Sequence, residues 1–167
     1  MIIVLLADGF EEIEALTPVD MLRRAGLTVK TVGIMKKTVL GAHGIPVVAD
    51  ASPDEINLDE VTMAVFPGGM PGATNLDASE YTDAVISAVQ RNRGHLAAIC
   101  AAPLVLGRRG LLNGKNATCF PGFESELLGA NVIDADFVTD GMVTTGRGME
   151  YSLPFSKELV KIALGNN

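Results

Sequence analysis

Cys100 stands at a point in the chain where a cysteine can become a nucleophile. It follows a short apolar run, residues 95–99, and two alanines and Pro103 come directly after it. Small residues permit the tight strand-to-helix turn that lifts a nucleophile above a sheet edge, as in the Gly-x-Ser-x-Gly elbow of hydrolases, and proline suits a first helical turn. A thiol at a helix N-terminus is predicted to have a lowered pKa. A buried structural cysteine is an equally good interpretation of this pattern alone.

Two other segments with chemically capable residues follow apolar runs. Residues 8–14, with three glutamates, come after the first run, and residues 67–69 come after a later one. Because ligands of open α/β sheets bind at the carboxyl ends of the strands, we expect both segments to meet Cys100 at one edge. Other interpretations stay open. An acidic first helical turn explains at least two of the glutamates, and Gly68 and Gly69 suit a tight turn as well as amides that approach an anion.

Three motifs together resemble a known family. They are Glu11-Glu12-Ile13-Glu14-Ala15 with Pro18-Val19-Asp20, then Phe66-Pro67-Gly68-Gly69, then Ala98-Ile99-Cys100-Ala101-Ala102-Pro103. Their order and spacing resemble the ThiJ/PfpI family, also called the DJ-one superfamily, and its DJ-one-like branch more than its PfpI protease branch. The resemblance implies an α/β, flavodoxin-like three-layer sandwich with a mostly parallel sheet, a nucleophile-elbow cysteine and a homodimer.

The resemblance also implies roles for single residues. The catalytic pair is Cys100 with a protonated glutamate that matches Glu14, and the oxyanion and substrate-binding amides match Gly69 and Ala101, with Gly68 beside them. Apart from the family, a carboxyl group in an apolar pocket beside a thiolate has a raised pKa, because burial and the neighbouring negative charge both disfavour its ionised form. Such a cysteine is suited to reversible oxidation or to attack on a reactive carbonyl.

The chain lacks the histidine that a cysteine hydrolase needs beside its nucleophile. Protease-like members of the resembled family place it directly after the cysteine, where this chain has Ala101, and other branches place one where this chain has Phe120. His95 lies five residues before Cys100 on the same predicted strand, so at about 3.3 Å per residue it is roughly 16 Å away. His43 is predicted to be a surface residue. Because hydrolysis needs an oriented general base, the sequence disfavours a peptidase or amidase and leaves Phe120 as a pocket-lining residue.

Arg147 and Cys119 are weaker candidates. By resemblance, Gly146-Arg147-Gly148 lies near the active site, where Arg147 attracts an anionic substrate, and an ordinary surface arginine is the alternative interpretation. Cys119 is predicted to be a packed or semi-exposed thiol with no catalytic part. No Cys/His cluster has zinc spacing, and neither a phosphate-binding loop nor a dinucleotide fingerprint is present, so we expect no metal and no cofactor.

Short apolar runs alternate with amphipathic stretches, the rhythm of βα units in a mostly parallel sheet. Predicted strands cover Ile2 to Ala7, Thr28 to Ile34, Ile45 to Ala49, Met63 to Phe66, Leu96 to Ile99, Ala117 to Phe120, Val132 to Val138 and Met142 to Thr145. Predicted helices cover Phe10 to Ala25, Ala78 to Asn92, Ala101 to Arg109 and Tyr151 to Leu164. Pro18 is predicted to interrupt or kink the first helix, and the apolar stripe predicted for that helix consists of Ile13, Leu16, Val19 and Leu22.

Composition sets the remaining limits. The 167 residues are predicted to form one domain, 1–167, because 48% are hydrophobic and only 20% are charged. A net charge of -7 argues against a nucleic acid held by charge. The N-terminal apolar run is too short for a signal peptide or a membrane span, and two cysteines do not make a disulfide framework. We therefore expect a cytoplasmic protein with no membrane partner.

The leading hypothesis is a cysteine-dependent stress-response protein that acts through Cys100 on small reactive aldehydes or glycated proteins. Its chemistry is of the glyoxalase III or protein deglycase type and needs no cofactor. The alternative is a non-enzymatic redox sensor or chaperone in which Cys100 becomes a sulfinate. Both hypotheses use the same pocket.

Overall fold

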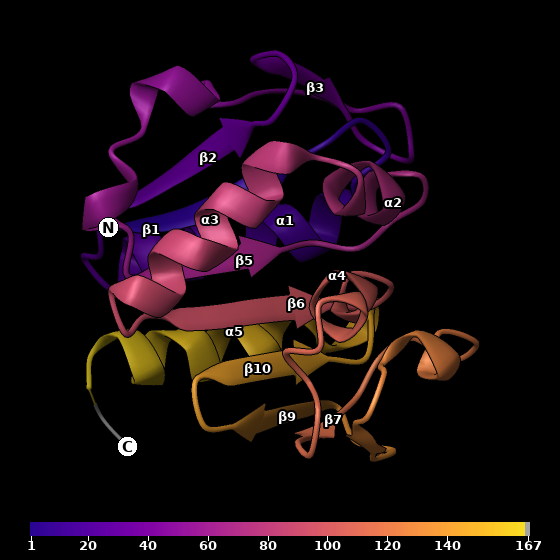
Figure 1. The fold of residues 1–167 in the computed structure, drawn as a ribbon. Coiled ribbons are helices and arrows are strands. Elements are labelled where there is room, and N and C mark those ends of the chain that lie inside the picture. The colour runs from indigo at the N-terminus through magenta and orange to yellow at the C-terminus, as the bar shows by residue number, and fades with distance from the viewer. Residues whose placement is uncertain (166–167) are drawn as a thin grey trace.

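Within residues 1–165, the part of the chain that the computed structural model describes, six strands form a mostly parallel sheet (Figure 1). The last two residues of the predicted domain, Asn166 and Asn167, lie outside the described residues. The strand order is β2-β1-β5-β6-β10-β9, and β9 alone in this sheet runs antiparallel to its neighbour. The strands are β1 (Ile2–Leu6), β2 (Val29–Gly33), β5 (Met63–Phe66), β6 (His95–Ile99), β9 (Phe137–Asp140) and β10 (Val143–Gly146).

Helices cover both faces of this sheet, which confirms the predicted flavodoxin-like three-layer architecture (Figure 1). α1 and α5 pack against each other on one face, and α2, α3 and α4 supply the core on the other. The helices are α1 (Glu12–Arg24), α2 (Gly72–Asp77), α3 (Glu80–Arg91), α4 (Pro103–Arg108) and α5 (Ser152–Ala163), with 3-10 turns at Pro53–Glu55, Leu58–Glu60, Glu124–Glu126 and Met149–Tyr151.

Three of the inner strands, β1, β5 and β6, are apolar almost throughout because both faces of the sheet are covered. Every residue of these strands is buried. Alternate side chains of a strand point to opposite faces, so Ile3 and Leu5 enter one core while Ile2, Val4 and Leu6 enter the other. A continuous apolar run is typical of a parallel strand buried on two sides. For this reason the three strands agree with their predicted ranges to within one residue.

The first helix continues through Pro18, where the sequence predicted an interruption or a kink. Proline has no N–H, so the helix loses the hydrogen bond to the carbonyl of Glu14, four residues earlier. The proline ring is buried on the face of α1 that packs in the interior. Packing of the ring therefore outweighs the loss of one hydrogen bond.

The predicted apolar stripe of α1 is only partly correct. Val19 and Leu22 are buried, whereas Ile13 is 47% exposed and Leu16 is 37% exposed. Residues that recur every three positions drift around a helix with 3.6 residues per turn, so they cannot all face the core. The buried face instead includes Ala15, and the outer face of α1 carries two uncovered apolar side chains.

Other predicted elements are divided or shortened. The helix predicted from Ala78 to Asn92 is α3, and the separate helix α2 before it was not predicted. The strand predicted from Ala117 to Phe120 shrinks to β7 (Asn116–Ala117), because the Thr118 amide donates to Thr145 Oγ1 and not to a strand carbonyl. The strand predicted from Val132 to Val138 divides into β8 (Asn131–Val132), which pairs with β7, and β9, because the chain bends between them to bond Arg147.

Glu12 holds a small hairpin against the first helix. The hairpin consists of β3 (Thr38–Leu40) and β4 (Pro46–Val48). In its turn, His43 N lies 2.8 Å from Glu12 Oε1 and His43 Nδ1 lies 2.9 Å from Glu12 Oε2. Burial raises the pKa of Glu12, but these hydrogen bonds outweigh it, so the pKa lies below its ordinary value of 4.5. Glu12 is therefore a buried structural carboxylate and not a solvated one.

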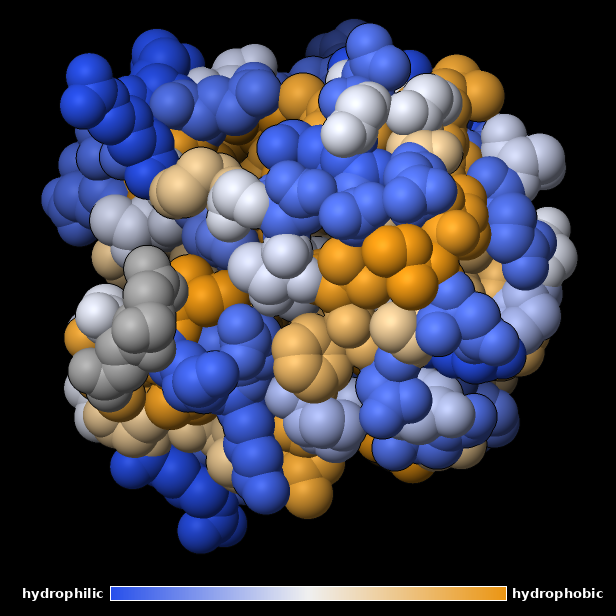
Figure 2. Space-filling model, turned by 90° about the horizontal axis from the view of Figure 1, so that it is seen from below, coloured by the Kyte–Doolittle hydropathy of each residue, from blue (hydrophilic) through white to orange (hydrophobic). Residues whose placement is uncertain are grey.

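The surface has a mixed character. Seen from below the view of Figure 1, apolar residues gather near the centre of the face and hydrophilic residues surround them (Figure 2). Among the helices of residues 1–165, none combines the length and the apolar character that a bilayer-spanning helix requires.

We expect Glu12→Gln to lower the free energy of unfolding by about 1–2 kcal/mol at neutral pH, because charge-assisted hydrogen bonds become neutral ones. The contribution of the carboxylate is present above its ordinary pKa of 4.5 and is lost as the pH falls through its lower pKa in the folded protein. Urea unfolding at about pH 7 and about pH 3 measures the difference, with the exposed Glu150→Gln as control. A difference that is equal at both pH values contradicts this role of Glu12.

Candidate active site

Cys100 lies at a strained turn at the carboxyl end of β6. Its φ of 65° falls in the left-handed region, which residues other than glycine rarely adopt. Two backbone hydrogen bonds hold it there: the Cys100 amide donates to the Gly146 carbonyl at 2.8 Å, and the Phe120 amide donates to the Cys100 carbonyl at 2.9 Å. Such strain persists only where the surrounding structure over-determines it, and it clusters at functional sites. The turn has the form of a nucleophile elbow.

Glu14 reaches the same sheet edge from the first turn of α1. Its side chain is fully buried, and its Oε2 accepts a hydrogen bond from the Gly68 amide at 2.9 Å. Its Oε1 is buried and has no partner among the described residues. A Cβ on Gly68 would lie 2.6 Å from Glu14 Oε2 and 2.7 Å from Cys100 Cβ. Only glycine at this position lets the carboxyl group and the thiol share one pocket.

Two backbone amides next to Cys100 act to lower the pKa of its thiol. They belong to Gly69 and Ala101, and their hydrogen bonds favour the thiolate. Gly69 has φ 82°, and a Cβ there would lie only 2.4 Å from the Glu11 amide nitrogen, so the position requires glycine. Ala101 is buried and follows the elbow directly. The structure thus brings together Cys100, Glu14 and both amides that the resemblance implied.

The predicted low pKa of Cys100 is wrong. Burial raises the pKa of this thiol, the negative charge and hydrogen bond of Glu14 raise it further, and the two amides offset only part of the effect. The prediction relied on the dipole of the helix that follows. That helix, α4, has only six residues and begins three residues after the cysteine, so desolvation of the sulfur dominates.

Glu14 and Cys100 titrate as a pair. Burial raises the pKa of Glu14 to about 7, although its hydrogen bonds with Cys100 and with the Gly68 amide act in the opposite direction. Because both pKa values are raised, the two groups together hold two protons below about pH 7 and one proton above it. Because the pKa of the thiol lies above that of Glu14, the negative charge of the pair lies mainly on the carboxylate, and only a minor share of the molecules carries it on the sulfur.

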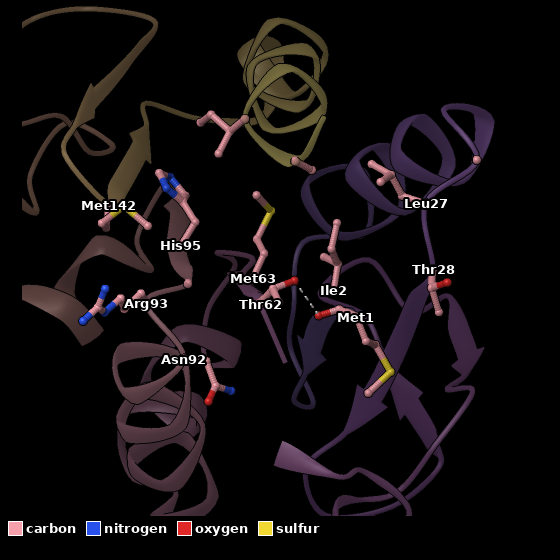
Figure 3. Close-up of a pocket in the computed structure, with 14 residues that line it drawn as sticks. Met1, Ile2, Leu27, Thr28, Thr62, Met63, Asn92, Arg93, His95 and Met142 are labelled. Carbon is pink, nitrogen blue, oxygen red and sulfur yellow. Dashed lines mark hydrogen bonds between the residues drawn. The ribbon is translucent and has the colours of Figure 1, made fainter. Parts of the chain in front are cut away.

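Within residues 1–165, no hydrogen bond joins either histidine to Cys100. His95 is buried at the start of β6, where its Nε2 lies 2.8 Å from Thr144 Oγ1, and burial lowers its pKa to about 4. It borders a cavity of about 490 Å³ at the amino-terminal edge of the sheet, where Met63 and Met142 also lie (Figure 3). His43 is exposed and binds Glu12. Both histidines therefore have partners away from the elbow.

Arg147 and Cys119 line a second cavity, of about 300 Å³. Arg147 forms an ion pair there with Asp134, so its charge is directed to an acidic partner and not to the sulfur of Cys100. Cys119 is buried, and burial raises its pKa to about 11, which makes it an unreactive packed thiol. Phe120, by contrast, adjoins Cys100 through its amide, and its side chain is 44% exposed.

The resemblance implied that Gly146-Arg147-Gly148 lies near the active site, but the backbone role of Gly146 was not predicted. Its carbonyl holds the Cys100 amide, and a Cβ on Gly146 would lie 2.9 Å from atoms of Ile99 and Phe155. A signal was present in the sequence, since a glycine at the end of a strand often marks a close approach of another backbone. The sequence around Gly146 did not show which segment of backbone approaches it.

One group of metal-ligating side chains occurs in the described part of the chain, formed by Glu11, Glu12 and His43, with donor atoms within 4.8 Å of one another. Both oxygens of Glu12 already bond to the hairpin turn. The group therefore serves to attach the hairpin to α1.

The fold and the site define a flavodoxin-like α/β protein with a cysteine at a nucleophile elbow. The chain belongs to the DJ-1/PfpI family, whose family model matches residues 1–162. It is 32% identical over 164 residues to Protein dj-1beta of Drosophila melanogaster, and the match covers 94% of this chain and 88% of the Drosophila chain. It is 28% identical to a deglycase of Pyrococcus abyssi, over 96% of this chain and 98% of that one.

Solved structures agree with this assignment. The crystal structure of a DJ-1 superfamily protein from Salmonella typhimurium has a TM-score of 0.90 and 32% sequence identity, and covers 99% of this chain and 90% of that chain. The names of these relatives support a position in the DJ-1-like branch of the superfamily.

We expect the rate of Cys100 alkylation by iodoacetamide to rise with pH around a midpoint near 7, where the pair loses its first proton. In Glu14→Gln the thiol ionises alone, so the midpoint near 7 is lost and the rate continues to rise at higher pH, because the charge of Glu14 no longer opposes the thiolate. Peptide mass spectrometry measures both thiols, and Cys119, with its pKa near 11, serves as the internal slow control. An unchanged midpoint in Glu14→Gln contradicts the coupling.

Proposed function

We propose that this chain is a cysteine-dependent stress-response protein that acts on small reactive aldehydes and on the adducts they form on proteins. Its chemistry is of the glyoxalase III or protein deglycase type and uses no cofactor. The observation that carries the proposal is the pair formed by the partly exposed Cys100 and the buried Glu14, with the amides of Gly69 and Ala101 at the sulfur. The name of the deglycase from Pyrococcus abyssi supports the substrate class.

The first step joins the sulfur to the aldehyde. With methylglyoxal, Cys100 Sγ adds to the aldehyde carbon, and the electrons of the carbonyl double bond move to its oxygen. The amides of Gly69 and Ala101 stabilise this oxyanion. The proton held by Glu14 is transferred to it, which gives a neutral hemithioacetal and leaves Glu14 as a carboxylate.

The second step moves a proton between neighbouring carbons. The Glu14 carboxylate removes the proton from the carbon that carries sulfur, an enediol forms, and the proton is returned to the former ketone carbon. The result is a lactoyl thioester on Cys100, in which one carbon is oxidised and its neighbour is reduced, so no external oxidant is needed. Water hydrolyses the thioester to lactate and the free thiol. With an adduct on a protein, the sulfur attacks the hemiaminal carbon, the carbon–nitrogen bond breaks, and the amine leaves with the proton of Glu14, which gives the same hemithioacetal.

A peptidase or amidase fits the site less well. Cleavage of an amide requires a general base, oriented by a third group, that also protonates the leaving amine. Both histidines are engaged elsewhere, His95 with Thr144 and His43 with Glu12. Glu14 is suited to proton transfer within a small substrate at the sulfur, which the aldehyde reaction requires.

An oxidation sensor is a second candidate, and the unpaired Oε1 of Glu14 favours it. Peroxide oxidises a thiol through the sulfenic to the sulfinic acid, and each step reduces one peroxide to water. Protonated Glu14 can donate a hydrogen bond to one sulfinate oxygen, and the amides of Gly69 and Ala101 can donate to the other. A chaperone-like change in partner binding would then depend on oxidation and not on turnover.

We also propose a homodimer in which a second copy covers the outer face of α1. Ile13 and Leu16 on α1 and Leu153 on the adjoining α5 are exposed apolar residues near the site. Exposed apolar side chains on neighbouring helices are typical of an interaction surface. We further propose a cytoplasmic location, since Cys100 and Cys119 are both free thiols.

We expect the protein to convert methylglyoxal to lactate and Cys100→Ser to lose kcat/KM by more than about a hundredfold. Glu14→Gln loses roughly a hundredfold to ten-thousandfold, because proton transfer by a side chain contributes a factor of that size. Cys119→Ser is the matched control and retains activity. Proton NMR measures the rate of lactate formation. If the wild-type protein forms lactate no faster than Cys100→Ser, the proposal that this chain is an enzyme of this type is wrong.

Mild peroxide treatment is expected to convert Cys100 to the sulfinate while Cys119 stays reduced, because only Cys100 combines partial exposure with donors for an anionic sulfur. Intact-mass and peptide mass spectrometry measure both thiols in one sample. Equal oxidation of the two cysteines argues against a specially held sulfur and with it against the sensor.

A further inference from the structure

The amides of Gly69 and Ala101, next to the sulfur of Cys100, belong to segments that lead into two short helices. α2 follows Gly69 and α4 follows Ala101, and the two helices lie next to each other at one end of the sheet (Figure 1). The Gly69 carbonyl accepts a hydrogen bond from the Ala73 amide of α2 at 2.9 Å. The Ala101 carbonyl accepts one from the Leu104 amide of α4 at 3.1 Å. The residue that carries each amide is thus bonded through its carbonyl to the first turn of its helix.

The far ends of the same two helices are joined by ion pairs. Asp77, the last residue of α2, places Oδ2 2.6 Å from Arg108 Nη1 and Oδ1 2.6 Å from Arg109 Nη1, at the end of α4. Arg109 Nη2 also donates to the Asp77 carbonyl at 2.8 Å. The side chains of Asp77 and Arg109 are only 17% and 20% exposed. Water and salt therefore screen this pair less than an ordinary surface salt bridge.

The network continues to neighbouring elements. Arg109 Nε lies 2.6 Å from Asp83 in the first turn of α3, and Arg108 Nε lies 2.8 Å from Glu126 in the turn after β7. Asp77, Asp83 and Glu126 belong to three different segments, so ion pairs from three segments hold the C-terminal end of α4.

α2 and α4 have six residues each. Helices this short are not stable by their own hydrogen bonds, so contacts with other elements set their positions. Both helices contribute apolar side chains to one core, but apolar attraction has no direction. A carboxylate that binds two guanidinium groups does impose a direction and a distance. Asp77 is therefore the contact that can set the spacing of the two helices.

We infer that Asp77, with Arg108 and Arg109, is a positioning residue for Cys100: by holding α2 against α4 it sets the separation of the Gly69 and Ala101 amides at the sulfur. The inference deepens the proposed function, on which it rests for the role of the amides. It assigns a part in the site to residues that lie at the opposite ends of the helices from the cysteine.

Asp77→Asn tests the inference, with the rate of Cys100 alkylation by iodoacetamide followed against pH. Misplaced amides bond the thiolate less well, so we expect the rate at neutral pH to fall about three- to tenfold and the midpoint to move upward. Asp59→Asn is the matched control: it removes the same charge from an exposed pair with Arg91 of 3.4 Å and leaves rate and midpoint unchanged. If Asp77 only stabilised the fold, Asp77→Asn would lower the melting temperature and leave the alkylation of Cys100 unchanged. A pH profile of alkylation for Asp77→Asn that equals the profile for Asp59→Asn therefore overturns the inference.

Arg109→Lys is the second variant, in case Asp77→Asn does not fold. It keeps the positive charge but cannot bind Asp77 and Asp83 with a planar fork, and we expect a smaller shift in the same direction. Lactate formation from methylglyoxal is measured in the same samples. Absence of turnover in the wild-type protein removes the proposed enzyme but leaves the alkylation comparison valid, whereas turnover with unchanged alkylation in both variants overturns the positioning role.

Discussion

The partly exposed thiol of Cys100 and the buried carboxyl group of Glu14 lie side by side, and the site depends on the proton that the two groups share. Burial disfavours each negative charge, so both pKa values are raised. The pair tolerates one charge because the Gly68 amide bonds the carboxylate while two further amides bond the sulfur. Reactivity here depends on hydrogen-bond geometry around a single charge, with both histidines bonded to other residues.

The rest of the fold places these groups within reach of each other. Strands β5 and β6 run parallel and adjacent, so the segments after them meet at one edge of the sheet. Gly68 and Gly146 leave no room for a side chain, which allows the carboxyl group and the elbow to approach. On the far side, α1 continues past Pro18 and carries Glu14 in its first turn. The site is therefore built from small residues and short helices, where a hydrolase site has a general base and a long helix.

Much of the fold was predictable from the sequence, because two-sided burial of parallel strands leaves continuous apolar runs, as in β1, β5 and β6. The meeting of Cys100 with Glu14 was predictable from linked motifs. Contacts that depend on distant segments were not predictable. In the sequence, Glu12 cannot be told apart from the other glutamates near it, because the hairpin that buries it lies about thirty residues later in the chain. The pKa of Cys100 depends on how deeply the sulfur is buried, and the spacing of residues in the sequence does not show this depth. Likewise, Arg147 pairs with Asp134 because the chain bends between β8 and β9, and no sequence motif marks this bend.

The protonated carboxyl group of Glu14 has its own infrared band, and this band tests the shared proton most directly. The difference between spectra of the wild-type protein and Glu14→Gln isolates it at each pH. A shared proton requires the band to persist well above the ordinary carboxyl pKa of 4.5 and to disappear with a midpoint of about 7. A band that disappears near 4.5 would mean that Glu14 is ionised throughout the neutral range, and it would contradict a proton shared with Cys100.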